Sequence, residues 1–546
     1  MPSTRRMMSR HSRATSPGSS VNWDGLMQNV VNPAATCGGI VARPGQGRRR
    51  HRWWGTRPGS ADEFQAARIT SGRPQRNYAA TVRLYPNVFR RACPANPGAA
   101  VTQAPDVAAI CERLREQGVD VVRVSYPDMI GVDRGRDVLL DELPTAVGHG
   151  LAFCRAVYHT SPMADVVPVQ GGLEMGLPDI TVYPDLATLT PLPWEPNAAW
   201  CLADATTPDG EAAPESPRTV ARRVAEQVAG LGYTLVCGPE LEFFVCQQAA
   251  DGSWQRYAND PGNVYVVGRK GDPEGLLLHM LRQLRDAGLR VTTANHEFSP
   301  GQFEINLGHS ELADAADRSF RLKSAVQEIA RHRGLLATFM AKPFNDEGGS
   351  GFHVHISIND ASGANVFGDP DGPDGLSPTG RYAIGGVLRH ARALSALLNP
   401  TVNSFKRFGP DTLAPWLIDW GLDNRSAMVR IPPERGSAAR MEVRLGDATA
   451  NPYLAMAALG AAIYLGIQDK VEPPAKLEGY GYDPARSQML PMRLGEALDA
   501  LESDNELGAV LGEFFVTSFL AYKRNEIERF ERFVTDWEFR EYAYHF

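Results

Sequence analysis

The stretch of sequence that most strongly constrains the fold is CGPELEFFV, residues 237–245. Glu240 and Glu242 are two positions apart, so in a β-strand both project from one face, while Leu241 and Phe243 project from the other. Two like charges side by side on an apolar strand repel each other and cost desolvation, unless a cation lies between them. Taken alone, a solvated strand face would explain this pattern equally well.

Three further strand-like segments carry polar side chains where a core strand is usually apolar. They are HEFSPGQFEIN (296–306), GSGFHVHIS (349–357) and RMEVR (440–444). The first has acids on both sides of a Pro-Gly turn, and the second alternates histidines with apolar residues. Together with the stretch at 237–245, these segments supply Glu240, Glu242, Glu297, Glu304, Glu442, His353 and His355.

Five carboxylates and one or two imidazoles, with no thiolate among them, favour Mg²⁺ or Mn²⁺ over Zn²⁺. Such metals commonly bridge nucleotide phosphates. Arginine binds phosphate or carboxylate in a bidentate way, and basic residues are frequent between positions 406 and 444. The residues alone therefore predict a metal-dependent, phosphate-handling enzyme with a second anionic substrate. The basic residues are Lys406, Arg407, Arg425, Arg430, Arg440 and Arg444.

Size and composition set the broad class. The chain has 546 residues, of which 43% are hydrophobic and 22% charged, as expected for a soluble globular enzyme of several domains. A net charge of -7 does not favour nucleic acid as a partner. The longest apolar stretch, 455–467, is too short to cross a bilayer and predicts a buried helix. Seven cysteines without a C-x-x-C spacing argue against a disulfide framework and predict a cytoplasmic protein.

The first 103 residues differ in composition from the rest. Residues 1–60 contain ten arginines and one acid, with abundant Gly, Pro and Ser, which predicts a disordered Arg-rich extension over 1–103. A solvated tail, a start codon assigned too early and a transit peptide all remain open. Further on, a Pro-, Glu- and Gly-rich stretch at 206–217 indicates a domain boundary. Helical spacing predicts helices over 107–117, 218–231, 273–288, 315–333 and most of 494–533, and residues 119–126 predict a strand.

In order, these motifs resemble those of the glutamine synthetase family. The resemblance extends over roughly residues 105–546 and rests on GPELEFF (238–244), HE (296–297) with GQFE (301–304), GSGFHVH (349–355), NP (399–400) with NSFKR (403–407), NRSA (424–427), RMEVR (440–444) and NPYL (451–454). It implies an α+β protein with a β-grasp N-terminal domain (104–213) and a catalytic domain (214–546). The antiparallel strands of the catalytic domain would form half of an intersubunit active-site barrel, with helices around it. Members of the family form rings, usually a dodecamer of two hexameric rings.

The resemblance also implies roles for individual residues. Glu304, Arg407 and Arg425 match catalytic positions, Arg425 lying on the transferred phosphate. The γ-phosphoryl group of ATP would pass to the side-chain carboxylate of L-glutamate, and an amine would then attack the acyl phosphate. The metal beside glutamate would be held by Glu242, Glu297 and Glu304, the metal beside ATP by Glu240, His353 and Glu442, glutamate by Arg407, Arg444 and the backbone at Gly349, and the nucleotide by Ser357, Arg430 and His355.

Two departures from the family pattern fall on the acceptor site. Leu413 stands where ammonia-using members have a glutamate, and Cys154 stands where they have an aspartate. A site without these carboxylates suits a carbon-bearing amine, so we expect a polyamine or a small monoamine such as ethanolamine as acceptor. A third departure, Gly348 in place of an asparagine, lies at the glutamate end. An ammonia-dependent glutamine synthetase, a non-catalytic family member and an unrelated metal-dependent hydrolase are the alternatives.

Overall fold

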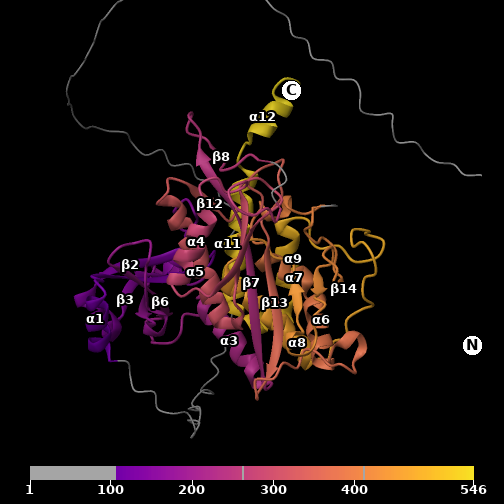
Figure 1. The fold of residues 1–546 in the computed structure, drawn as a ribbon, viewed down its shortest axis with the longest axis horizontal. Coiled ribbons are helices and arrows are strands. Elements are labelled where there is room, and N and C mark those ends of the chain that lie inside the picture. Colours follow the sequence, from indigo (N-terminus) through magenta and orange to yellow (C-terminus); the bar gives the residue numbers. More distant parts are fainter. Residues whose placement is uncertain (1–105, 261–263, 410–411) are drawn as a thin grey trace, which may run out of the picture. The chain divides into compact units, whose positions relative to one another are not determined.

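The computed structural model describes residues 106–260, 264–409 and 412–546, all within one compact unit, Ala99–Phe546. The predicted extension over 1–103 lies outside the described residues. The fold is mixed α/β and contains two sheets (Figure 1). Its buried apolar side chains form two main hydrophobic cores. In the described part of the chain, no helix is both long and apolar enough to cross a membrane.

The first sheet has six strands in the order β2-β1-β6-β4-β3, with β5 paired to β6. β1 runs parallel to β6, and all the other strand pairs of this sheet are antiparallel. Helices α1 (Val107–Glu116) and α2 (Leu143–His149) contribute apolar side chains to the core beside this sheet. The strands are β1 (Val121–Pro127), β2 (Asp133–Leu139), β3 (Leu151–Cys154), β4 (Asp179–Pro184), β5 (Thr190–Pro191) and β6 (Ala198–Thr206).

The second sheet has ten strands and curls into a half-barrel. Its longest strand, β7 (Tyr233–Gln248), runs through the middle of the fold beside β13 (Phe352–Asp360), as Figure 1 shows. Burial alternates along residues 235–243, so the strand predicted at 237–245 is confirmed with Leu241 and Phe243 on the core face. The other strands are β8 (Trp254–Arg256), β9 (Val291–His296), β10 (Gln302–Leu307), β11 (Ser310–Glu311), β12 (Leu336–Thr338), β14 (Trp420–Leu422), β15 (Val429–Ile431) and β16 (Met441–Val443).

Helices cover the apolar face of this sheet. α3 (Pro217–Gly230) and α5 (Leu312–Arg331) pack against β7, and α8 (Pro452–Gln468) packs on both helices. A Cβ at Gly460 of α8 would lie 2.9 Å from the side chains of Leu312 and Val224, so glycine permits the close approach. The remaining helices are α4 (Leu276–Asp286), α6 (Pro378–Arg389), α7 (Ala391–Leu398), α9 (Leu494–Ser503), α10 (Asn505–Leu511), α11 (Glu513–Glu531) and α12 (Asp536–Tyr542).

Most of the predicted helices are confirmed to within three residues, including the buried helix that became α8. The helix predicted over 273–288 is shorter, because Gly275 has a left-handed φ of 71° and precedes the first turn. The carboxylate of Asp272 accepts hydrogen bonds from the backbone amides of Leu276 and Leu277, which places the helix start there. The domain boundary near 213 and the β-grasp description of the first sheet stay predictions.

A buried arginine connects the first sheet to the helical layer. The Arg218 side chain on α3 is 2% exposed and forms ion pairs of 2.7–2.9 Å with Asp185, Asp204 and Asp317. Because a buried charge is tolerated only when it is paired, this network holds α3, α5 and the first sheet in one arrangement.

Candidate active site

The polar face of the second sheet brings the predicted carboxylates and histidines together. Glu240 on β7 is paired in register with His353 on β13, and Glu242 is paired with Glu304 on β10. Because residues of one strand face alternate, both acids of β7 lie on the face opposite Leu241. The two neighbouring strands therefore each add one polar side chain beside β7.

The opposite edge of β13 extends this polar face. His355 is paired in register with Glu442 on β16, which is in turn paired with Arg430 on β15. The imidazole Nε2 of His355 lies 3.2 Å from Glu240 Oε1, and Nδ1 of His353 lies 3.7 Å from Glu240 Oε2 and 3.8 Å from Glu442 Oε1. Strands that are distant in sequence thus converge on Glu240.

Two groups of side chains have donor atoms close enough to hold a metal ion. Glu240, Glu304 and His353 form one group, and Glu240, His355 and Glu442 form the other, with the donor atoms of each group within 4.8 Å of one another. All the donors are carboxylate oxygens or imidazole nitrogens, which fits Mg²⁺ or Mn²⁺. His355 is thus grouped with metal-ligand candidates, although the resemblance implies that it lies on the nucleotide side.

The carboxylates repel one another strongly without a cation between them. Burial and the neighbouring charges of Glu240, Glu242 and Glu297 raise the pKa of Glu304 to about 9. Burial and the charge of Glu242 raise the pKa of Glu297 to about 7. Burial acts in the same direction on Glu240, but hydrogen bonds from His353 and His355 hold the pKa of its carboxyl far below the usual range. A bound divalent cation would relieve the repulsion, so the residues fit such a group.

Two arginines hold Glu442 in place. Arg444 Nη1 lies 2.6 Å from Glu442 Oε1, and Arg430 Nη1 lies 2.5 Å from Glu442 Oε2. Burial raises the pKa of Glu442, but Arg444 and the two histidines outweigh it and hold the pKa at about 2. Glu442 therefore stays ionised beside its arginines, and Arg430 also reaches Asp423 at 2.7 Å.

Arg407 lies buried next to the backbone of the Gly-Ser-Gly segment. Its guanidinium donates to Asn399 Oδ1 at 3.4 Å and to the carbonyls of Leu445 and Arg444 at 3.3 and 3.4 Å. A Cβ at Gly349 would lie 2.6 Å from Arg407 Cγ, so only glycine allows this approach. Within the described part of the chain, Arg407 forms no ion pair, and it therefore has capacity for an anionic ligand.

Two residues near the site were missed by sequence reasoning. The side-chain amide of Gln302 donates to Glu242 Oε2 at 3.1 Å and to the Gly349 carbonyl at 3.0 Å, so it connects the acids to the segment beside Arg407. Tyr265 is 65% exposed, and its phenol interacts electrostatically with Arg425 and Glu297. Gln302 lies in the GQFE motif (301–304), so the sequence could have indicated it. No residue spacing in the sequence indicates Tyr265.

The remaining predicted residues lie at the periphery or elsewhere. Ser357 shares the face of β13 that carries the two histidines, and Arg425 is exposed on the turn before β15. Leu413 has a left-handed φ of 61° and is 47% exposed. Cys154 ends β3 in the first sheet, where its thiol lies 3.8 Å from the Leu177 carbonyl. Among the described residues, no hydrogen bond or ion pair joins Cys154 to the second sheet.

Comparisons with known proteins agree with this geometry. Residues 214–542 match the family described as glutamine synthetase, catalytic domain. A glutamine synthetase from Halobacterium salinarum is 33% identical over 446 residues, covering 79% of this chain and 95% of the relative. A protein named glutamate–isopropylamine ligase from a Pseudomonas species is 32% identical over 443 residues, covering 79% of this chain and 96% of that protein.

A solved structure described as GmaS without ligand is similar with a TM-score of 0.71 and 33% identity, covering 80% of this chain and 99% of that one. The structural similarity therefore extends over the first sheet as well as the second. The family match over 214–542 and the converging carboxylates, histidines and arginines support the same assignment. The chain belongs to the glutamine synthetase family.

Proposed function

We propose that this family ligase phosphorylates the side-chain carboxylate of L-glutamate with ATP and condenses it with an amine to a γ-glutamyl amide. The observation that carries the proposal is a sheet face crowded with carboxylates and, beside it, the buried Arg407, which forms no ion pair among the described residues. Such a face suits two anionic substrates brought together, because metal ions and arginines offset their mutual repulsion.

The proposed metal-binding roles are those that the resemblance to the family implies; the two donor groups of the structure support metal binding on this face but divide the donors differently. Glu242, Glu297 and Glu304 would hold the metal beside glutamate, and Glu240, His353 and Glu442 the metal beside ATP. When bound, Mg²⁺ or Mn²⁺ supplies charge stabilisation to the phosphate oxygens. The chain's own contribution is to fix these donors on paired strands. His355, hydrogen-bonded to Glu240, orients that carboxylate from the nucleotide side.

The arginines would bind and orient the anionic substrates. Arg407 and Arg444, with the backbone at Gly349, would bind the glutamate, and Arg425 would contact the transferred phosphoryl group. Arg430 and Ser357 would lie on the nucleotide side. Glutamate binding would give Arg407 an ion-pair partner, because it forms no ion pair among the described residues. An amine then attacks the acyl phosphate, the new C–N bond forms as the nitrogen gives up a proton, the C–O bond to phosphate breaks, and inorganic phosphate leaves.

The acceptor is proposed to be an amine with a carbon chain. Leu413 offers an apolar side chain and Cys154 a thiol where ammonia-using relatives place carboxylates. A carbon-bearing amine gains about 0.8 kcal/mol per buried CH₂ group, which ammonia cannot. The relative named glutamate–isopropylamine ligase supports a small monoamine; a polyamine remains within the proposal.

Two other functions have weaker support. An ammonia-dependent glutamine synthetase is favoured by the relatives that carry this name. A non-catalytic family member is disfavoured by the complete set of acids and histidines on the sheet face.

The assembly is proposed to be a homo-oligomer, in the family's form a dodecamer of two hexameric rings. α12 and the residues after it expose Trp537, Phe539, Tyr542, Tyr544 and Phe546. An apolar cluster of this kind on a projecting helix is typical of a segment that contacts another chain. The β-grasp N-terminal domain (104–213) and the catalytic domain (214–546), with its half of an intersubunit barrel, belong to the same proposal.

The test is phosphate release from ATP and glutamate, with ammonium, methylamine, isopropylamine, ethanolamine, putrescine and spermine compared by kcat/KM under one set of conditions. We expect at least one carbon-bearing amine to exceed ammonium tenfold. A tenfold preference for ammonium would instead establish the glutamine synthetase reaction, and no release with any acceptor would refute both ligases.

A further inference from the structure

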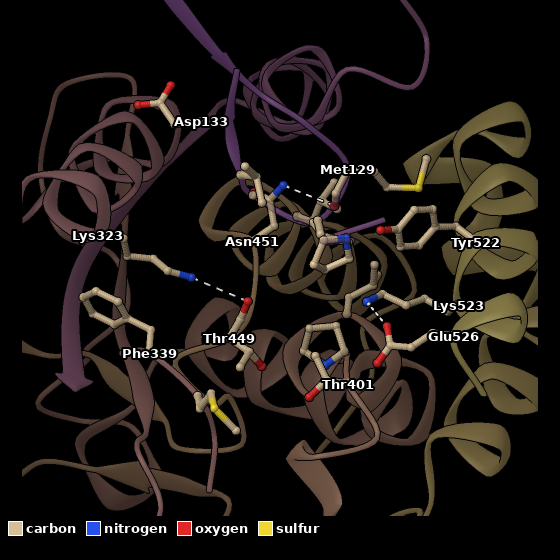
Figure 2. A pocket seen from close by; sticks show the side chains of 18 of the residues that line it. Met129, Asp133, Lys323, Phe339, Thr401, Thr449, Asn451, Tyr522, Lys523 and Glu526 are labelled. Carbon is tan, nitrogen blue, oxygen red and sulfur yellow. Dashed lines mark hydrogen bonds and ion pairs between the residues drawn. The ribbon is translucent and has the colours of Figure 1, made fainter. Parts of the chain in front are cut away.

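A cavity of about 670 Å³ lies away from the carboxylate face, between the first sheet and helices α5 and α11 (Figure 2). The loop after β1 forms one wall, and the segments around Thr401 and Thr449 form another. This volume lies within the ~300–1,000 Å³ range of small-molecule pockets. The proposed ligase reaction uses none of the residues that line it.

Two basic side chains of the lining, Lys323 and Arg529, are held mainly by uncharged acceptors. The ammonium of Lys323 donates to the Ala450 carbonyl at 3.0 Å and lies 5.5 Å from the ring centre of Phe339. Arg529 donates from Nε to Asn525 Oδ1 at 3.0 Å. Within the residues that the structure describes, neither side chain forms an ion pair. Burial lowers the pKa of Lys323 to about 8, although the nearby carboxyl of Asp447 acts in the opposite direction.

The acids that line the cavity do not form ion pairs with Lys323 or Arg529. Glu526 is already paired with Lys523 at 2.9 Å and accepts a hydrogen bond from the Val402 amide at 3.2 Å. Asp133 lies at the upper edge of the view, away from the Lys323 ammonium, which points toward Thr449 (Figure 2). Among the described residues, Lys323 therefore has no ion-pair partner and donates only to backbone carbonyls.

The other walls are largely apolar. Met129, Phe339, Met340, Leu397 and Phe519 contribute to the lining. An inorganic anion would leave these side chains unused, whereas the hydrocarbon part of an organic anion would bury them.

We propose that this cavity binds a small organic carboxylate, with its carboxylate at the Lys323 ammonium and its hydrocarbon part beside Phe339 and Met129. The site is separate from the carboxylate face of the second sheet, and nothing in the ligase reaction requires it.

The lining is also connected to Arg407 through a short chain of hydrogen bonds. The hydroxyl of Ser404 lies 2.9 Å from that of Thr401 and 3.4 Å from that of Thr449, both on the cavity wall. The Arg407 amide donates to the Ser404 carbonyl at 3.1 Å. A ligand in the cavity therefore acts on the segment that positions Arg407, and this coupling rests on the proposed role of Arg407 in glutamate binding.

Binding is tested by isothermal titration of hexanoate into the full chain, with glutamate, Mg²⁺ and a non-hydrolysable ATP analogue present at saturation to occupy the reaction site. We expect saturable binding of hexanoate, none of the neutral hexanamide, and weaker binding of inorganic phosphate. Lys323→Gln should weaken hexanoate binding at least tenfold, and Lys470→Gln, an exposed lysine outside the cavity, should leave it unchanged. If Lys323→Gln does not fold, Arg529→Gln provides the second comparison and should weaken binding at least threefold.

No saturable binding to the wild type, or equal binding by the folded Lys323→Gln and Arg529→Gln variants, would overturn the site. Phosphate binding as tight as hexanoate would overturn the organic class of ligand. Saturating hexanoate should change the KM for glutamate at least twofold in the wild type, and an unchanged KM would overturn the coupling. Because binding is measured without turnover, its failure is distinguishable from failure of the proposed ligase.

Discussion

Replacing Glu304 by glutamine tests whether the acids of the second sheet are built around a cation. The change keeps the size and polarity of the side chain, and removes an ionisable carboxyl whose charge is disfavoured by burial and by Glu240, Glu242 and Glu297. We expect the metal-free Glu304→Gln variant to be more stable than the wild type, and to lose most of the stabilisation that Mg²⁺ or Mn²⁺ provides.

The size of the effect follows from the pKa of Glu304, which is raised from 4.5 to about 9. The folded metal-free protein keeps this carboxyl protonated at pH 7.5, whereas the unfolded chain ionises it. At ~1.4 kcal/mol per pH unit, the interval of roughly three units from 4.5 to 7.5 corresponds to a cost of about 4 kcal/mol. Since the folded pKa is the higher one, the cost is absent below about pH 4.5, grows as pH rises and levels off above about pH 9.

The assay is urea denaturation of both proteins in EDTA, and then in excess Mg²⁺ or Mn²⁺, between pH 5 and pH 9. The stability difference in EDTA should favour the variant by about 2–4 kcal/mol at pH 7.5 and shrink toward pH 5. Glu226→Gln, at an exposed position of α3, is the matched control and should change neither stability nor metal response. The reasoning would be refuted if the Glu304→Gln variant were less stable than the wild type in EDTA. It would also be refuted if Mg²⁺ or Mn²⁺ raised the free energy of unfolding of the variant as much as that of the wild type.

Three other changes test separate parts of the structure. Leu413→Glu should raise kcat/KM for ammonium relative to isopropylamine at least tenfold, because it returns a carboxylate to the proposed acceptor site; an unchanged ratio in the amine panel would contradict this role. Arg218→Met should cost about 3–5 kcal/mol in urea denaturation because it leaves three aspartates without their buried partner, whereas Arg222→Met, whose side chain is 40% exposed, should cost less than about 1 kcal/mol. Deleting Met1–Gln103 should leave turnover and the size of the oligomer unchanged, and a large fall in either, by steady-state kinetics or light scattering, would show that the segment contributes.

The local elements were predictable because their signals are local. The alternation of Glu240, Leu241, Glu242 and Phe243 predicts a strand with one polar face, and the structure has that strand. The start of α4 was mispredicted by three residues because apolar spacing does not report the capping carboxylate of Asp272. A cap involves one side chain and the first backbone amides, and periodicity over a longer window does not detect it.

The composition of the candidate site was predictable, but its registers were not. The sequence contains Glu242 and Glu304 in separate strands, yet their direct pairing depends on strand register, which tertiary packing determines. The contact of His355 with Glu240 and the exposed position of Tyr265 depend in the same way on how distant segments meet. The cavity beside Lys323 had no sequence signal, because an unpaired buried ammonium is recognisable only once its neighbours are known.

The spread of the site over four strands also has a consequence for biosynthesis. Glu240 is on β7 and Glu442 is on β16, so α5, β13, α6 and α7 are all translated between them. At roughly 5–20 residues per second, the ribosome needs on the order of 10–40 s for that interval. During this time the acids of β7 have no Glu442 or Arg444 beside them, and the group formed by Glu240, His355 and Glu442 lacks its last donor. The other group, Glu240, Glu304 and His353, is present once residue 353 has been made, so the two candidate metal groups are completed at different times during translation.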